Sequence, residues 1–150
     1  MTDKSVLPDF ELPATGNQRF QLSAFKGHPF VLYFYPRDDT PGCTDEGKQF
    51  RDLHAKFVNA RVPVFGVSRD SPWTHIAWAQ TLDLSFPLLS DWNAEAVQGF
   101  GVSRDFRGFR DIARRAAFLV DGEGTVRATW SYEDSEVPDF DELVRAAQAL

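Results

Sequence analysis

The segment that most restricts the fold is 30–35, six consecutive apolar or aromatic residues that end at Pro36. A strand with one face in water alternates apolar and polar residues, so this unbroken run indicates a strand buried on both faces. Pro36 has no N–H for a sheet ladder and ends the strand. A strand covered on both sides requires a layered fold, and a chain of 150 residues predicts one domain over residues 1–150.

Strand and helix patterns alternate along the rest of the chain. Residues 10–22 contain two short strand-like pieces around a turn with Gly16, which predicts an N-terminal β-hairpin. The alternation predicts an α/β fold, a mixed central sheet with helices on both faces, ordered as in a thioredoxin-like three-layer sandwich. The expected strands are 30–35, 62–67, 86–89, 117–120 and 125–132, and the expected helices are 44–59, 73–82, 94–100 and 139–150.

Composition excludes several classes of protein. A hydrophobic fraction of 43%, with 14 Phe and 4 Trp, fills a core and excludes intrinsic disorder. The net charge of -6 argues against a nucleic-acid partner, because neutralising phosphates requires an excess of Lys and Arg. The first five residues lack the layout of a signal peptide, and the longest apolar run is too short to span a bilayer. We therefore expect a cytoplasmic protein that needs no membrane.

The chain has a single cysteine, Cys43, which excludes an intramolecular disulfide, a CxxC redox pair and a multi-cysteine zinc site. Most lone cysteines are small buried hydrophobes, but the surroundings of this one favour a reactive thiol. Cys43 follows a polar, turn-rich loop and lies in the first turn of an expected helix, where free N–H groups and the helix dipole favour the thiolate. Thr40, three residues earlier, can turn its hydroxyl toward the sulfur.

A thiolate in this position suits attack on a peroxide. The thiolate is the nucleophilic form of cysteine. The N–H groups at the start of a helix can bind the O–O group and the negative charge that develops on the leaving oxygen. A cysteine hydrolase would instead need a partner His and Asp, and no spacing in the sequence supports that alternative.

The residues around Cys43 resemble a known active site. The string 34–46, Phe-Tyr-Pro-Arg-Asp-Asp-Thr-Pro-Gly-Cys-Thr-Asp-Glu, contains Pro-x-x-x-Thr-x-x-Cys and is similar to the peroxiredoxin active-site loop. The longer string resembles the bacterioferritin-comigratory-protein (BCP) or Q-type branch of the AhpC/TSA superfamily, and segments 66–71, 86–91 and 118–121 are similar to that branch. The resemblance implies a thiol-dependent peroxidase without metal, flavin, haem or nucleotide, which reduces hydrogen peroxide and alkyl hydroperoxides through a Cys43 sulfenic acid. The alternative is a non-catalytic binding or chaperone-like module on the same scaffold.

The resemblance also implies an active-site arginine shortly before the penultimate strand. The family has an Arg-x-Thr-Phe type of string there, and Arg115 begins the matching segment, with Ala117 where Thr is usual. Arg115 is therefore expected to stabilise the thiolate and polarise the peroxide. The neighbouring Arg114 is one position off the match and is expected to be a solvated side chain.

Further roles near Cys43 follow from the same resemblance. Pro36 is expected to shield the thiolate, and Thr40 and the Cys43 N–H are expected to bind the peroxide. Glu46 is expected in the first turn of the helix, where a carboxylate suits the dipole, and in a network around the active-site arginine. Gly42, next to the nucleophile, is a supporting position.

The chain departs from the branch at the second redox residue. Many members carry a resolving cysteine five residues after the peroxidatic one, where this chain has Lys48, and others place it on the following helix, where 73–82 contains none. The sequence therefore predicts a one-cysteine peroxiredoxin, whose sulfenic acid no second thiol of the same chain can capture. A thioredoxin- or glutaredoxin-like protein, a low-molecular-weight thiol or Cys43 of a second subunit could react with it. Both a monomer and a homodimer stay open.

Other conspicuous residues have simpler interpretations. His28, His54 and His75 are scattered and share no metal-ligand spacing with the cysteine, so we expect no metal site. Trp73 and Trp78 lie five residues apart on one expected helix and are interpreted as partly buried packing residues, although an exposed pair would mark an interface.

Residues 104–115 contain five Arg and two Asp. A run of this kind is usually a solvated connection, and we expect one here. A sharper hypothesis is that these arginines raise the local positive potential and attract anionic peroxides or an acidic reductase, which would make the peroxide reaction sensitive to salt.

Overall fold

The computed structural model describes residues 9–16, 18–38, 40–133 and 139–150 of the chain. The strands among these residues are β1 (Glu11–Ala14), β2 (Gln18–Gln21), β3 (Phe30–Phe34), β4 (Val64–Ser68), β5 (Leu88–Ser90), β6 (Ser103–Phe106), β7 (Phe109–Ala113), β8 (Ala116–Val120) and β9 (Val126–Ser131). The helices are α1 (Pro41–Asn59), α2 (Pro72–Leu82), α3 (Glu95–Gly99) and α4 (Phe140–Gln148), with a 3₁₀ turn, η1, at Leu22–Phe25. No helix in the described part of the chain is both long and apolar enough to cross a membrane.

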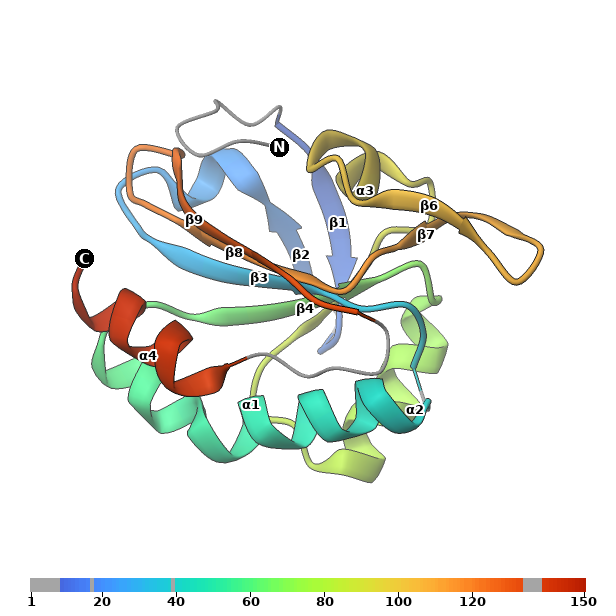
Figure 1. Ribbon diagram of the computed structural model, residues 1–150, viewed down its shortest axis with the longest axis horizontal. Helices are drawn as coiled ribbons and strands as arrows, with labels where there is room; N and C mark the ends of the chain where they lie inside the picture. Colours follow the sequence, from blue (N-terminus) through green and yellow to red (C-terminus); the bar gives the residue numbers. More distant parts are fainter. Residues whose placement is uncertain (1–8, 17, 39, 134–138) are drawn as a thin grey trace.

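Seven of these strands form one sheet in the order β2-β1-β5-β4-β3-β8-β9 (Figure 1). β3, β4 and β5 run parallel in its centre. β8 and β9 continue the sheet antiparallel on one side, and the β1–β2 hairpin does so on the other. The mixed sheet and the N-terminal hairpin confirm the predicted architecture.

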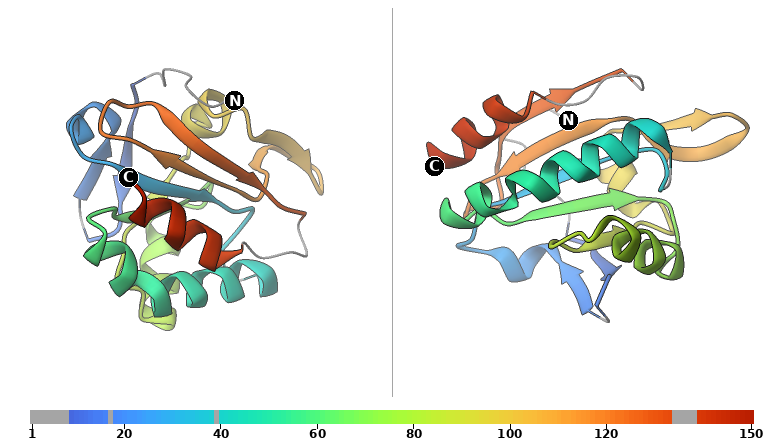
Figure 2. Two further views of the ribbon diagram at one scale, coloured as in Figure 1. Left: turned by 60° about the vertical axis from the view of Figure 1, so that its left-hand side comes forward. Right: turned by 90° about the horizontal axis from the view of Figure 1, so that it is seen from below.

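β3 is buried along its whole length, as its unbroken apolar sequence predicts. Phe30, Leu32 and Phe34 belong to one core cluster, packed with residues of the N-terminal hairpin, η1 and α3. Tyr33 and Tyr35 belong to the second cluster, with α1, α2 and α4. These three helices cover one face of the sheet, whereas α3 lies on the other side near the β6–β7 hairpin (Figure 2). Helices therefore lie on both faces.

Polar side chains cap the starts of α2 and α4. The Ser71 side chain accepts a hydrogen bond from the N–H of Thr74 and caps α2, with Pro72 at the first helical position. The Asp139 side chain caps α4 in the same way. α1 begins at Pro41, three residues before the expected start at Thr44, so Cys43 is the third residue of the helix.

Residues 104–115 are largely solvated, as expected, but they are not an irregular connection. They contain most of the β6–β7 hairpin, whose turn residues Arg107 and Gly108 both have positive φ. Two of the arginines pack their guanidinium groups on an aromatic ring of the hairpin. The guanidinium carbons of Arg104 and Arg107 lie 4.4 and 5.3 Å from the centre of the Phe106 ring.

One of the two tryptophans expected to pack against the core is on the surface. Trp78 is 5% exposed, but Trp73 is 79% exposed. Five residues advance a helix by about 140°, so the two indoles cannot share one face.

Gly66 of β4 provides a test of the core beneath α1. A Cβ at this position would lie 2.7 Å from Cζ of Tyr33 and 2.8 Å from Cδ2 of Leu88. The Tyr33 ring stacks on Phe50 at 4.3 Å and is fully buried, so it cannot move aside. Gly66→Ala is expected to lower the free energy of unfolding by about 1–3 kcal/mol in urea titrations.

The matched control is Gly47→Ala in α1. Its added Cβ would meet Cδ1 of Leu82 at 3.5 Å, an ordinary contact. Alanine is favoured over glycine inside a helix, so this variant is expected to gain about 0.5–1 kcal/mol. Equal effects of the two substitutions would contradict the packing argument.

Candidate active site

The sheet topology brings Cys43 and Arg115 together although they are 72 residues apart. Cys43 follows the loop that leaves the carboxyl end of β3. Phe34, the last residue of β3, pairs with Ala116, the first residue of β8. Arg115 immediately precedes Ala116 and therefore lies beside the loop from which α1 starts.

Three of the residues singled out in the sequence form one buried cluster. Nη2 of Arg115 lies 3.3 Å from Sγ of Cys43, and Nη1 donates to Oε1 of Glu46 at 2.5 Å. Cys43 is 1% exposed, Glu46 0% and Arg115 2%. Arg114 is exposed, as expected. The cluster thus holds one guanidinium between a thiol and a carboxyl group, out of contact with bulk water.

Burial raises the pKa of the Cys43 thiol above its ordinary value. The Arg115 charge acts in the opposite direction and is the largest such effect, followed by hydrogen bonding from the Thr40 side chain and the Arg37 backbone. The helix start was expected to favour the thiolate, but desolvation outweighs that effect in the closed site, and Arg115 is the largest influence that opposes the desolvation.

Glu46 lies in the second turn of α1 and not in the first, so the interpretation through the helix dipole was wrong. Burial raises its pKa to about 8, against the opposing effect of Arg115. Its Oε2 atom has no hydrogen-bond partner among the described residues. Both observations favour a protonated Glu46 near neutral pH, which leaves the Arg115 charge to act on the sulfur.

The remaining predicted site residues surround the start of α1. Thr40 is the N-cap residue of the helix, but its side chain makes no capping bond. Its hydroxyl donates instead to the carbonyl of Arg37 at 3.0 Å, and it also lies close enough to the sulfur to lower the pKa of Cys43. Pro36 is buried two residues after the end of β3, and Gly42 lies in the first turn of α1.

A buried relay that the sequence did not reveal anchors the loop between β3 and α1. The Tyr35 hydroxyl donates to Oδ1 of Asp38 at 2.6 Å, and Oδ2 of Asp38 lies 2.6 Å from Nδ1 of His75. Nε2 of His75 lies 3.0 Å from the carbonyl oxygen of Leu89. The side chains of Asp38 and His75 are 0% exposed. The relay connects the loop to α2 and β5.

The geometry of this relay fixes its protons. A carbonyl oxygen only accepts, so Nε2 of His75 carries a hydrogen that it donates to Leu89. Nδ1 faces a carboxylate oxygen, and the short contact between them requires one further proton shared by Nδ1 and Oδ2. His75 and Asp38 therefore act together as one hydrogen-bonded pair.

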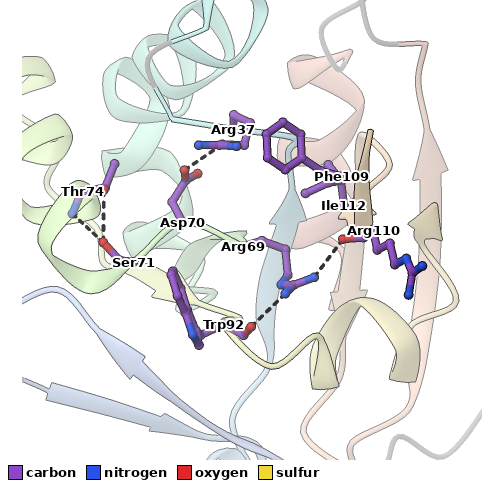
Figure 3. Close-up of a pocket in the computed structure, with 9 residues that line it drawn as sticks. All are labelled: Arg37, Arg69, Asp70, Ser71, Thr74, Trp92, Phe109, Arg110 and Ile112. Atoms are coloured by element: carbon purple, nitrogen blue, oxygen red, sulfur yellow. Dashed lines mark hydrogen bonds and ion pairs between the residues drawn. The ribbon is translucent and has the colours of Figure 1, made fainter. Parts of the chain in front are cut away.

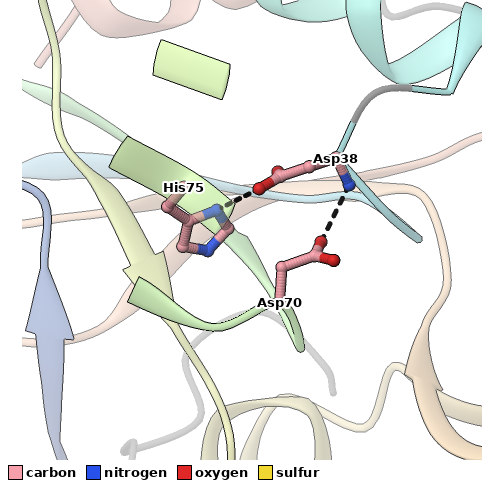
Figure 4. A group of neighbouring side chains, drawn as sticks. All are labelled: Asp38, Asp70 and His75. Carbon is pink, nitrogen blue, oxygen red and sulfur yellow. Dashed lines mark hydrogen bonds and ion pairs between the residues drawn. The ribbon is translucent and has the colours of Figure 1, made fainter. Parts of the chain in front are cut away.

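Asp70, which follows β4, holds the same loop from a second side (Figure 4). It accepts hydrogen bonds from Nε of Arg37 at 3.0 Å, from the N–H of Asp38 at 2.8 Å and from the Ser68 hydroxyl at 2.6 Å. Ligand-type atoms of Asp38, Asp70 and His75 lie within 4.8 Å of one another. Each of these groups already has hydrogen-bond partners, so we assign the cluster to support of the loop.

A buried lone thiol at the start of a helix, held beside a guanidinium on a thioredoxin-like sheet, is the arrangement of a thiol-dependent peroxidase. Residues 4–129 match the AhpC/TSA family. The chain belongs to that family, and within it to the peroxiredoxin Q or BCP branch, of which it is a one-cysteine member.

Comparison with individual relatives supports this assignment. The chain is 36% identical over 143 residues to the chloroplastic peroxiredoxin Q of Populus jackii, a match that covers 95% of this chain and 66% of that protein, so it spans about two thirds of that relative. It is 36% identical over 150 residues to the peroxiredoxin Q of Sedum lineare, covering 100% of this chain and 80% of that one. A structure of the bacterioferritin comigratory protein of Xanthomonas campestris superposes with a TM-score of 0.86 at 33% identity, covering 99% and 98% of the two chains.

The raised pKa of Glu46 predicts a specific dependence of stability on pH. The folded state keeps a proton up to about pH 8 that the unfolded chain releases near the ordinary pKa of 4.5. Stability is therefore lost as pH rises from about 4.5 to about 8. Glu46→Gln does not titrate, so its stability relative to the wild type should increase across this window in urea unfolding at several pH values. A constant difference between the two proteins, with the exposed Glu123→Gln as control, would refute a protonated Glu46.

The relay predicts that Asp38→Asn and Asp38→Ala differ strongly. The amide of Asn can accept from Tyr35 and donate to Nδ1 of a neutral His75, so its cost is expected below about 1.5 kcal/mol. Asp38→Ala leaves the buried Tyr35 and His75 groups unpartnered and is expected to cost about 3–5 kcal/mol. Chemical denaturation of the two variants measures both values. Similar losses for Asn and Ala would show that the carboxylate charge, and not the hydrogen-bond pattern, supports the loop.

Proposed function

We propose that Cys43 is the peroxidatic residue and reduces hydrogen peroxide and alkyl hydroperoxides. The observation that carries this assignment is the 3.3 Å contact between the Arg115 guanidinium and the Cys43 sulfur in a buried site. A buried cation offsets the cost of the thiolate, which is the nucleophile. The alkyl peroxide reduction described for the X. campestris relative supports the substrate class.

The reaction needs one nucleophile and donors for the leaving oxygen. The Cys43 thiolate attacks the terminal peroxide oxygen, so that an S–O bond forms while the O–O bond breaks. The leaving oxygen takes up a proton and departs as water or alcohol, and the sulfur is oxidised to a sulfenic acid. The N–H of Cys43, at the third helical position, has no acceptor within the helix and can donate to the peroxide.

The neighbouring residues prepare this step. Arg115 stabilises the thiolate and polarises the peroxide, and Thr40 supplies a hydroxyl to the bound oxygen. Pro36 excludes water from the sulfur. Glu46 is a positioning residue, because it contacts Arg115 and not the reacting atoms, and Gly42 supports the first turn of the helix.

The catalytic cycle closes only with thiols from outside the chain. Cys43 is the single cysteine, and the resolving position of the branch is occupied by Lys48, an exposed residue of α1. An external thiol condenses with the sulfenic acid to a mixed disulfide and water, and a second thiol then releases Cys43. The reductant is a thioredoxin- or glutaredoxin-like protein or a low-molecular-weight thiol.

The oligomeric state and the location of the protein are part of the proposed function. Residues 1–150 act as a single domain, as a monomer or homodimer, without nucleic acid or membrane. A cytoplasmic location keeps the lone thiol reduced between turnovers. The non-catalytic module considered as an alternative is not favoured, because the relatives are peroxiredoxins over most of the chain.

The proposed roles of Cys43 and Arg115 can be tested by single-turnover kinetics. One equivalent of peroxide should disappear with the addition of one oxygen atom to Cys43 by intact mass, and Cys43→Ser should do neither. Arg115→Met is expected to slow the step by about 10²–10³-fold, the usual effect of removing a group that stabilises the reacting anion.

Arg114→Met is the matched control, since this neighbouring arginine is exposed and should tolerate the change. Circular dichroism verifies that each variant is folded. A Cys43 that reacts with peroxide no faster than a free thiol at the same pH would disprove the proposed function.

A further inference from the structure

Three arginines line a cleft (Figure 3), and one of them, Arg37, lies in the same loop between β3 and α1 that leads to Cys43. Its volume is about 510 Å³. Arg37 enters it from the loop after β3, Arg69 from the segment after β4, and Trp92 from the segment after β5. The carboxyl ends of parallel strands are where α/β sheets bind ligands. Phe109 of β7 closes the opposite side, and Arg110 lies at the rim, with its backbone carbonyl toward Arg69 and its side chain extending away from the cleft in Figure 3. We call this site the arginine cleft.

The arginine cleft has an excess of positive charge in a chain whose net charge is -6. Its lining contains three arginines and a single acidic residue, Asp70, which pairs with Arg37 at 3.0 Å. Arg69 donates to the carbonyl oxygens of Asp111 at 2.8 Å and Trp92 at 2.9 Å, so no carboxylate neutralises it through these bonds. Arg110 is exposed and makes no ion pair with the described residues. The cleft therefore suits an anion.

Exposed aromatic rings flank these charges. Trp92 is 61% exposed and Phe109 56%, and they lie on two sides of Arg69 in Figure 3. The guanidinium carbon of Arg37 lies 5.4 Å from the centre of the Phe109 ring. Apolar walls with a few convergent polar groups, in a volume between about 300 and 1,000 Å³, are typical of sites for small organic molecules.

Arg37 connects the arginine cleft to the sulfur. Its side chain lines the cleft, while its backbone is close enough to lower the pKa of Cys43 and accepts the Thr40 hydroxyl. A ligand in the cleft therefore lies across one loop segment from the sulfenic acid. Because Cys43 is only 1% exposed, an external thiol has to pass its immediate neighbours, and Arg37 is one of them.

We propose that the arginine cleft binds the external reductant, and that this reductant is a low-molecular-weight thiol bearing carboxylates. The inference rests on the proposed function of Cys43. The bound thiol attacks the Cys43 sulfur, an S–S bond forms, and the hydroxyl leaves as water with the proton of the thiol. A second molecule of the same thiol then attacks the mixed disulfide, which returns Cys43 as a thiol and releases the symmetrical disulfide.

A second copy of the chain fits this cleft less well. A two-fold interface places the same patch of both subunits face to face. The arginines of the two copies would then lie close together, and like charges across an interface are unfavourable. The charge of the cleft therefore favours a small anion over self-association through this face.

The proposal is tested by the charge of the reducing thiol. Peroxide is first added in one equivalent to form the sulfenic acid, and its reduction is then followed by stopped flow with three probes. These are glutathione, which is anionic, 2-mercaptoethanol, which is uncharged, and cysteamine, which is cationic. Each rate constant is divided by the fraction of the probe that is thiolate at the working pH, because the three thiols have different pKa values. Glutathione is expected to react about tenfold faster than the others at low salt and to lose this advantage at high salt.

Arg110→Glu provides the matched variant, since Arg110 takes no part in the proposed peroxide reaction. It should remove most of the preference for glutathione while sulfenic acid formation and the rate with 2-mercaptoethanol stay unchanged. Arg61→Glu makes the same charge change in an exposed residue between α1 and β4. Arg61 lies near the amino ends of the parallel strands, far from the cleft at their carboxyl ends, so this variant should have no effect. S-methylglutathione should bind the Cys43→Ser protein saturably by calorimetry, and more weakly when Arg110→Glu is added.

Equal rate constants for the three thiols, or an unchanged glutathione rate in Arg110→Glu, would overturn the proposal. Reduction by a dithiol protein but by none of the three probes would do the same. Failure to form a sulfenic acid at all would instead refute the proposed function of Cys43, so the two failures are distinguishable.

Discussion

The active site depends on one buried positive charge. Arg115 faces two acidic groups, the Cys43 thiol and the Glu46 carboxyl. Burial lowers the pKa of Arg115, but Glu46 and Cys43 together raise it above its ordinary value, so the charge persists. One guanidinium offsets one anion, and ionising both partners would leave an excess negative charge in the core. Because burial keeps the proton on Glu46 to about pH 8, the guanidinium can support the thiolate instead.

The rest of the fold holds the Arg115 guanidinium next to the Cys43 sulfur. The pairing of Phe34 with Ala116 fixes the backbone next to Arg115, and the same strand β3 leads into the loop that ends at Cys43. The loop is then tied on two sides, by Asp38 to His75 of α2 and by the Asp38 N–H to Asp70 after β4. Groups held in place before the reaction need no reorganisation when charge moves, which is how a static scaffold contributes to catalysis.

Local patterns were sufficient for much of the fold and for the centre of the site. The apolar run of β3, the helical spacing in α1 and the string around Cys43 are each encoded in consecutive residues, and Arg115 was found through the family string before β8. The Asp38–His75 relay joins residues 37 positions apart, and its importance comes from burial, which no local pattern specifies. The same limit applies to the pKa of Cys43: the helix start is visible in the sequence, whereas the desolvation that outweighs it arises from packing.

A single cysteine makes the competition for the sulfenic acid the central problem of the cycle. Reduction requires a thiol, and a second peroxide converts the sulfenic acid irreversibly to a sulfinic acid. No second cysteine of the chain offers the high effective concentration of an intramolecular partner. A thiol already held beside the Arg37 segment would supply part of that advantage, because its attack would no longer wait for a bimolecular encounter. The arginine cleft and the solitary cysteine are then two aspects of one arrangement, in which local binding of the reductant takes the place of the missing resolving residue.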